Sequence, residues 1–218
     1  MSLKMSLKID LHVHTSYSPC SNLSLRTIET VARKRGLDGI AITDHNTIAG
    51  ALELKSRASQ LLVIVAEEIK TSEGEIIGYF LTDSIPPALS VRETMQEIKC
   101  QGGLVSIPHP FDTLRTSRLG RSALEEIISE VDMIEVFNSR DLLQNTDAEF
   151  IEAWKNKGVV PVVGSDAHQR WEIGKSYMIM EEFNSPQEFL ANLRTAQSVY
   201  KKSPFWVHLV TKVVKQFK

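Results

Sequence analysis

Two histidines separated by one residue close the first apolar run of the chain, in the segment DLHVHTSYSPC. Side chains alternate between the two faces of a β-strand, which predicts that Asp10, His12 and His14 share one face and that Leu11 and Val13 share the other. Two imidazoles that point the same way are typical of a metal site, although a single such pair also occurs in ordinary core strands. Ligands elsewhere in the chain therefore decide between the two interpretations.

Four more segments end an apolar run with a histidine or a carboxylate. They are ITDHN, with Asp44 and His45; VAEE, with Glu68; SIPHP, with His109; and GSDAH, with Asp166 and His168. Parallel strands carry their functional loops at their carboxyl ends, so we expect these five strand ends to meet at one edge of the sheet. Imidazoles and carboxylates without thiolates suit Zn, Mn, Fe or Co. The pattern predicts a cluster of metal ions.

The elements expected to position these residues are short strands rich in Val and Ile that alternate with amphipathic helices. The predicted strands span residues 8–14, 39–43, 61–69, 75–81, 104–108, 133–137, 159–163 and 176–180. The predicted helices span residues 25–35, 48–59, 91–101, 123–130, 147–157 and 186–196. Gly36, Gly102 and Gly158 follow helical stretches, where left-handed helix ends are expected. The alternation predicts a parallel sheet covered by helices, either closed as a barrel or open.

The chain has 218 residues, 42% of them hydrophobic and 24% charged, which fits one globular domain over residues 1–218 with a core at about 8–197. A last helix is expected at about 205–218, packed on the body or, as a basic amphipathic helix, on a membrane surface or a partner. The formal net charge of -2 argues against binding of duplex nucleic acid. Two distant cysteines, no signal peptide and no membrane-spanning apolar run predict a cytoplasmic protein without disulfides.

Taken in order, the segments DLHVHTSYS, GLDGIAITDHNT, EEIKTSEGEIIGYFL, PHP and GSDAH resemble the PHP (polymerase and histidinol phosphatase) superfamily. The resemblance extends from about residue 8 to about residue 196. It implies a distorted (β/α)7 barrel of the PHP type, with a binuclear or trinuclear metal site at the carboxyl ends of the strands. It also implies a stand-alone phosphoesterase.

The resemblance assigns the metal ligands to residues already singled out. Matched motif by motif, they are His12, His14, His45, Glu68, His109, Asp166 and His168. Glu75 stands where relatives have histidine or glutamate, and it is expected to ligate through oxygen. Cys20 stands where many relatives have aspartate, so it binds metal, lines the pocket or leaves one ion weakly held. Two or three divalent ions, Mn, Zn or Fe, are expected.

Paired divalent ions activate water and stabilise the oxygens of a transferred phosphoryl group. Glu68 and Asp166 are the expected bridging ligands because a carboxylate has two oxygens to share. The expected catalytic residues are His45, His168 and Asp166. One of the two histidines is alternatively the proton donor to the leaving oxygen.

Other polar residues are expected around the metal ligands. Asp10 and Asp44 could fix the orientation of imidazoles. Arg115 and Arg118, which follow PHPFD, carry guanidinium groups that suit phosphate oxygens. Asn138, in the segment IEVFN, matches a position beside the family's site and is a third candidate for contact with substrate.

The leading functional hypothesis is hydrolysis of a small phosphorylated metabolite, nucleotide or short oligonucleotide. One alternative is an amidohydrolase-like enzyme that cleaves C–N or C–O bonds, because H-x-H on a first barrel strand is shared chemistry. Another is a non-catalytic module that binds metal or nucleotide. Metal content and a substrate panel separate the three.

Overall fold

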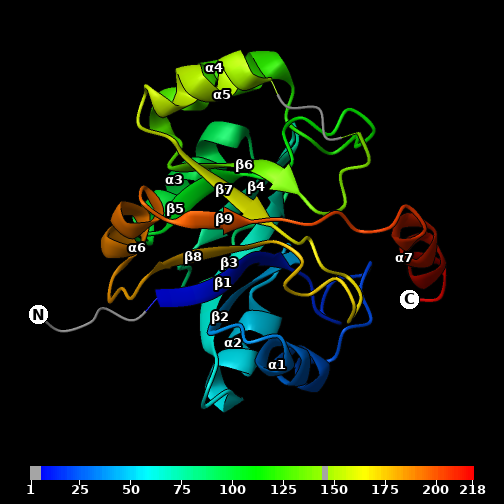
Figure 1. Ribbon diagram of the computed structural model, residues 1–218. Coiled ribbons are helices and arrows are strands. Elements are labelled where there is room, and N and C mark those ends of the chain that lie inside the picture. The colour runs from blue at the N-terminus through cyan, green and yellow to red at the C-terminus, as the bar shows by residue number, and fades with distance from the viewer. Residues whose placement is uncertain (1–5, 144–146) are drawn as a thin grey trace, which may run out of the picture.

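A mixed sheet lies at the centre of the molecule, with helices on its outer face (Figure 1). The computed structural model describes residues 6–143 and 147–218, and the strand order over these residues is β7-β6-β5-β4-β3-β2-β1-β8-β9. The strands are β1 (Ser6–Val13), β2 (Gly39–His45), β3 (Leu62–Lys70), β4 (Glu75–Tyr79), β5 (Leu104–Ile107), β6 (Met133–Asn138), β7 (Val160–Gly164), β8 (Tyr177–Glu181) and β9 (Gln197–Val199). The helices are α1 (Leu25–Lys34), α2 (Ala49–Arg57), α3 (Val91–Cys100), α4 (Arg121–Ile127), α5 (Ala148–Lys155), α6 (Pro186–Leu193) and α7 (Val207–Gln216), with a 3-10 turn at Ile128–Glu130.

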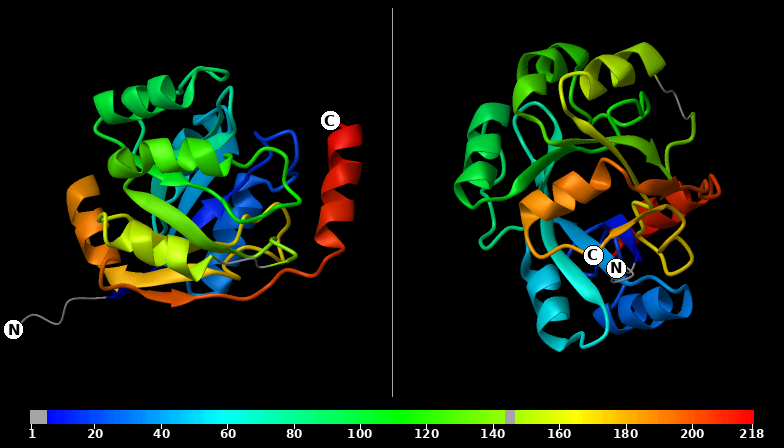
Figure 2. Two further views of the ribbon diagram at one scale, coloured as in Figure 1. Left: turned by 90° about the horizontal axis from the view of Figure 1, so that it is seen from above. Right: turned by 60° about the vertical axis from the view of Figure 1, so that its left-hand side comes forward.

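The sheet curves until the segment after β7 meets the end of β1, so that the barrel is nearly closed. The backbone N–H of His14 donates to the carbonyl of Ala167 at 2.9 Å, and the N–H of Ala167 donates to the carbonyl of His12 at 3.2 Å. The first half of β1 pairs with β8 instead. Helices α6 and α7 lie at opposite ends of this barrel (Figures 1 and 2). The expected distorted α/β barrel is confirmed.

The expectation of a wholly parallel sheet is wrong for three strands. β4 runs antiparallel to β3 and β5, β8 runs antiparallel to β1, and β9, which was not predicted, runs antiparallel to β8. Only residues 71–74 separate β3 from β4, whereas a parallel connection needs a dozen residues or more. Gly74 has a φ of +150° in this turn, and a Cβ there would meet the backbone of Leu119.

Local sequence explains the first helix, which lies close to its predicted position. The Ser24 hydroxyl accepts a hydrogen bond from the N–H of Thr27 at 3.2 Å and caps the first turn of α1. Leu25 and Ile28 bury the inner face of the helix. Gly36 follows at a φ of +66° and ends α1 as predicted.

Alternation along β3 sends two neighbouring carboxylates in different directions. Glu68 faces the end of the barrel where the histidines gather, whereas Glu67 accepts a hydrogen bond from the N–H of Ile85 at 2.9 Å. Burial raises the pKa of Glu67 to about 7. Glu67 is fully buried, so its ionisation at rising pH destabilises the folded state.

The substitution Glu67→Gln should stabilise the protein at alkaline pH. The folded state binds more protons than the unfolded state between about pH 4.5 and 7, so this carboxyl makes stability fall as the pH rises through that range. We expect the variant to exceed the parent by on the order of 2 kcal/mol at pH 8 and by much less at pH 5. Urea unfolding at both pH values measures this, and a difference independent of pH would contradict it.

Candidate metal centre

The side chains of His12 and His14 converge at the carboxyl end of β1, where their Nε2 atoms lie 3.2 Å apart. Two carboxylate oxygens, Glu68 Oε2 and Asp166 Oδ1, each lie 3.3 Å from His14 Nε2. The same oxygens lie 3.7 Å and 3.6 Å from His12 Nε2. All four side chains are fully buried. Residues from three distant segments therefore meet at one point, as the sequence predicts.

Glu68 occupies the centre of a second group of side chains. Its Oε2 lies 3.1 Å from Nδ1 of His45, and its Oε1 lies 2.9 Å from Nε2 of His109. Glu75, on the neighbouring strand β4, approaches the same two rings at 3.8 Å and 3.7 Å. The β3–β4 hairpin therefore brings the second predicted glutamate beside the first.

Asp166 holds the other side of the centre. Its Oδ2 accepts hydrogen bonds from Arg115 Nη2 at 2.7 Å and from Asn138 Nδ2 at 3.3 Å. The Nδ1 atom of His168 lies 2.8 Å from the carbonyl oxygen of Asp166, so Nδ1 carries the proton and Nε2 keeps its lone pair. Asp166 and His109 have φ values of +51° and +32°, and such left-handed backbone at non-glycine residues clusters at functional sites.

The buried oxygens fit a metal centre. Among the described residues, Glu68 Oε2 and Asp166 Oδ1 accept no hydrogen bond, although three imidazole nitrogens lie within 3.7 Å of each. A buried carboxylate oxygen without a partner is costly unless a cation occupies the space it faces. Three overlapping groups of potential ligands surround this space, namely His12, His14 and Asp166; His45, Glu68 and Glu75; and His14, Cys20, His45 and His168.

Glu135, on β6, is a site residue that the sequence reasoning missed. Its Oε1 lies 3.1 Å from Nδ1 of His12, and its Oε2 accepts from the backbone N–H of His109 at 2.8 Å and from Asn138 Nδ2 at 2.9 Å. Burial lowers the pKa of His12, but Asp166 and Glu135 outweigh burial and raise it well above its usual value. A metal ion would therefore displace a proton from this ring. A carboxylate inside the apolar run MIEVF was the available signal.

The two aspartates expected to orient imidazoles act through other groups. Asp44 accepts from Ser18 Oγ at 2.6 Å, and Ser18 Oγ lies 3.2 Å from Nδ1 of His14. Asp10 accepts from the backbone N–H groups of Ser165 at 3.1 Å and Gly174 at 2.7 Å, so it fixes the chain around the site rather than a ring. Burial raises the pKa of Asp10 to about 6.

A register shift in β1 changes one detail of the predicted strand. Pairing with β2 is irregular between Asp10 and Val13, and Leu11 and Val13 pack in two different hydrophobic clusters instead of sharing one face. The physical reason is the bulge, which turns the strand where it leaves the sheet.

Burial and opposite charges set the pKa values of the ligands in complementary directions. Burial lowers the pKa of three rings, those of His14, His45 and His168. Burial opposes ionisation of Glu68, but the facing imidazoles outweigh it and hold the pKa of Glu68 well below the usual range. Burial also opposes ionisation of Asp166, and there the Arg115 guanidinium outweighs it and holds the pKa well below the usual range. Neutral imidazoles and ionised carboxylates are the forms that bind divalent ions.

A pocket of about 390 Å³ opens beside the centre, between the barrel and α7. Its lining includes the predicted residues His45, Glu75, Arg115 and His168, together with Arg140, His208, Thr211, Lys212 and Lys215. Arg118 does not line this pocket and instead lines another, of about 340 Å³, with Phe111, Arg121 and Phe150. Of the two predicted arginines, Arg115 alone is thus placed at the metal centre.

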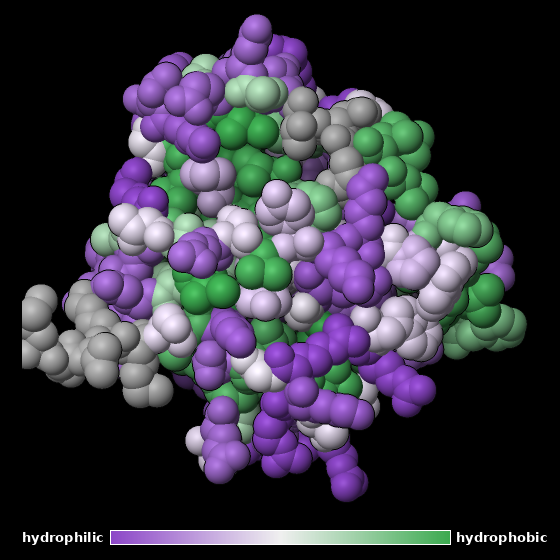
Figure 3. Space-filling view, viewed as in Figure 1, coloured by the Kyte–Doolittle hydropathy of each residue, from purple (hydrophilic) through white to green (hydrophobic). Residues whose placement is uncertain are grey.

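Helix α7 forms the outer wall of the 390 Å³ pocket; it spans Val207–Gln216, and the expected terminal helix spanned about residues 205–218. Arg140 Nη2 donates to Thr211 Oγ1 at 2.6 Å, and Nε2 of His208 lies 2.9 Å from the carbonyl of Arg140. Apolar side chains gather on the outer side of α7, at the right-hand edge of Figure 3. Within the described residues, no helix combines the length and apolarity needed to cross a membrane.

Comparison with known proteins agrees with this geometry. The family model of the PHP domain matches residues 10–204. An uncharacterized protein of Methanocaldococcus jannaschii is 42% identical over 158 residues, which cover 65% of this chain and 89% of the relative. A probable phosphatase of Caldicellulosiruptor saccharolyticus is 26% identical over 228 residues, which cover 86% of this chain and 92% of that protein.

A solved structure shares the fold. It is a two-domain protein of Bacteroides vulgatus that contains a predicted PHP-like metal-dependent phosphoesterase, with a TM-score of 0.73 and 21% sequence identity. The match covers 91% of this chain and 66% of that one. At this identity the likeness shows the fold and not the substrate.

Proposed function

The chain belongs to the PHP domain family, and we propose that it is a phosphoesterase that uses two or three divalent ions to hydrolyse a small phosphorylated metabolite, nucleotide or short oligonucleotide. One observation carries the proposal. Among the described residues, Glu68 Oε2 and Asp166 Oδ1 accept no hydrogen bond and face the shared imidazoles of His12 and His14. Beside them opens a pocket whose lining includes cationic side chains. Ligands for cations and groups for an anion thus lie side by side.

The proposed ligands of the carboxylate-rich part are His12, His14, Glu68, Glu75, His109 and Asp166. Divalent ions at such a centre supply Lewis-acid activation of water and neutralise the charge of the transferred phosphoryl group. Glu68 and Asp166 would be the bridging ligands, because Glu68 Oε2 and Asp166 Oδ1 accept no hydrogen bond from the residues that the structure describes. Mn, Zn and Fe are all compatible with these donors.

Residues of this chain would hold the substrate. The Arg115 guanidinium pairs with Asp166 and lines the pocket, so its remaining N–H groups can bind phosphate oxygens. Asn138 donates to Asp166 and Glu135, and we assign it to fixing these carboxylates rather than to the substrate. His168, with Nδ1 engaged and Nε2 free, serves as a ligand rather than as the proton donor.

Lys215 and Lys212 should raise affinity for the anionic substrate from the α7 side of the pocket. We expect Lys215→Ala to increase KM about fivefold to tenfold and to leave kcat within about twofold, because a partly exposed charge pair is worth about 1 kcal/mol. Steady-state kinetics at low and high salt measures this. Lys157→Ala, at an exposed position after α5, is the matched control. An unchanged KM in Lys215→Ala would remove α7 from substrate binding.

A substrate panel tests the proposed function directly. Protein loaded with Mn²⁺, Zn²⁺ or Fe²⁺ should release phosphate from p-nitrophenyl phosphate, sugar phosphates or nucleotides, and a chelator should abolish the release. Amides and lactones are included in the same panel. Turnover confined to those compounds would replace the phosphoesterase by an amidohydrolase-like enzyme.

A further inference from the structure

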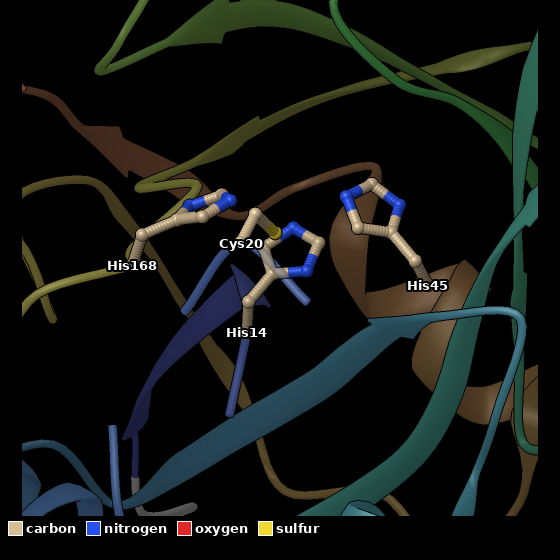
Figure 4. Close-up of side chains that lie close together, drawn as sticks. All are labelled: His14, Cys20, His45 and His168. Carbon is tan, nitrogen blue, oxygen red and sulfur yellow. The ribbon is translucent and has the colours of Figure 1, made fainter. Parts of the chain in front are cut away.

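Cys20 lies among imidazoles at the edge of the metal centre (Figure 4). The donor atoms of His14, Cys20, His45 and His168 all lie within 4.8 Å of one another. The thiol is free and only 1% exposed. Ser21 Oγ donates to the carbonyls of His14 and His168, at 3.1 Å in each case, and so fastens the loop that carries Cys20 against both histidines.

Of these four side chains, His45 also belongs to the group with Glu68 and Glu75 of the carboxylate-rich part, so it would serve a second ion only through its other ring nitrogen. His14 belongs to that part, because its Nε2 lies 3.3 Å from two carboxylate oxygens. His45 and His168 each direct Nδ1 toward an oxygen of the site and keep a second ring nitrogen. Within residues 6–143 and 147–218, Cys20 belongs to no group of potential ligands that contains a carboxylate. One thiol and two imidazoles can therefore serve a separate ion.

We propose that Cys20, His45 and His168 hold a zinc-class ion through a thiolate, beside the carboxylate-rich part, with the fourth coordination position open to the pocket. This inference rests on the proposed metal centre. A thiolate is a soft ligand that selects zinc over manganese or magnesium. Three protein ligands and one open position are the arrangement of catalytic zinc sites, and both histidines line the pocket.

The spacing of the donors permits this coordination. Zinc bonds of 2.0–2.1 Å to nitrogen and 2.3 Å to sulfur in a tetrahedron place the donors about 3.4–3.6 Å apart. Donors now up to 4.8 Å apart would approach one another by about 1 Å. Cys20 and His168 lie on loops and His45 is the last residue of β2, so changes in their rotamers can supply such a shift without moving the strands. The enzyme would then hold two kinds of metal position within one cluster.

Cobalt spectroscopy reports the thiolate without relying on turnover. The Cys100→Ser variant serves as the parent, because Cys100 is the chain's other cysteine and is exposed. Loaded with Co²⁺, the parent protein should show a near-ultraviolet thiolate-to-cobalt charge-transfer band. Loaded with Zn²⁺, it should bind one more equivalent than Cys20→Ala in the same background. Cys20→Asp should keep the equivalent and lose the band. Thermal unfolding checks that each variant is folded.

Two results would overturn the inference. One is a parent protein that binds cobalt at the carboxylate-rich part but shows no charge-transfer band. The other is a folded Cys20→Ala variant with unchanged zinc content. Phosphate release is followed in the same samples, so that activity without the band refutes the thiolate site alone, and the band without activity refutes the phosphoesterase alone.

Discussion

Asp166→Asn lowers phosphoester hydrolysis about 10³-fold and removes bound metal, if Asp166 bridges the ions as proposed. The amide keeps the size of the carboxyl group, but it loses the charge and one of the two oxygens. Asp166 Oδ1 is the unpartnered oxygen that faces three imidazole nitrogens, and Oδ2 is paired with Arg115 at 2.7 Å. An amide nitrogen in either place would face a cation.

Asp112→Asn is the matched control for this prediction. Asp112 lines the same pocket, and its Oδ2 lies 3.5 Å from Nε of Arg115. It belongs to no group of potential metal ligands formed by the described residues. We expect its metal content to be unchanged and its turnover to fall by less than about tenfold. Metal analysis and phosphate release are measured on both variants. Full metal content and turnover in Asp166→Asn would show that the site is assigned wrongly.

Arg140→Ala should produce the largest loss of stability. Arg140 and Glu172 are 3% and 0% exposed, and Arg140 Nε lies 3.6 Å from Glu172 Oε1. Removing the guanidinium leaves a buried carboxylate without its cation, which costs about 3–5 kcal/mol. It also removes the hydrogen bonds that join Arg140 to Val207 and Thr211 of α7. The pocket wall should therefore loosen and KM should rise.

The double variant Arg140→Met with Glu172→Gln separates charge from packing. Replacing both partners removes the unpaired charge, so most of the lost stability should return while the contacts to α7 stay broken. Burial raises the pKa of Glu172 above its usual value, so the deficit of Arg140→Ala should also be smaller at pH 5 than at pH 8. Urea unfolding measures both effects. A single variant as stable as the parent at both pH values would contradict this account.

Periodicity predicted the convergence of His12, His14 and Glu68 because each stands at the end of an apolar strand. Such positions depend on local pattern, which a single sequence displays. The direction of β4 was predicted wrongly because the four residues between Lys70 and Glu75 were not recognised as a hairpin turn, which makes β4 antiparallel to β3. Glu135 was missed because it lies inside β6 and not at the end of an apolar run, where the other candidates were sought.

The wall formed by α7 could not be predicted from local pattern. The segment shows lysines on an amphipathic helix, but only the fold places Lys215 opposite His45 in one pocket. The docking depends on Arg140, whose contacts with α7 span 67 and 71 residues. Interactions of this kind become visible only in three dimensions.

Titration of metal-free protein with Mn²⁺, with phosphate release as the readout, measures whether hydrolysis depends on the metal centre. We expect no release without metal and a rise to a plateau at two or three equivalents of Mn²⁺ per chain. Release that is undiminished in the metal-free protein, or no release at any loading across the phosphoester panel, would contradict this expectation.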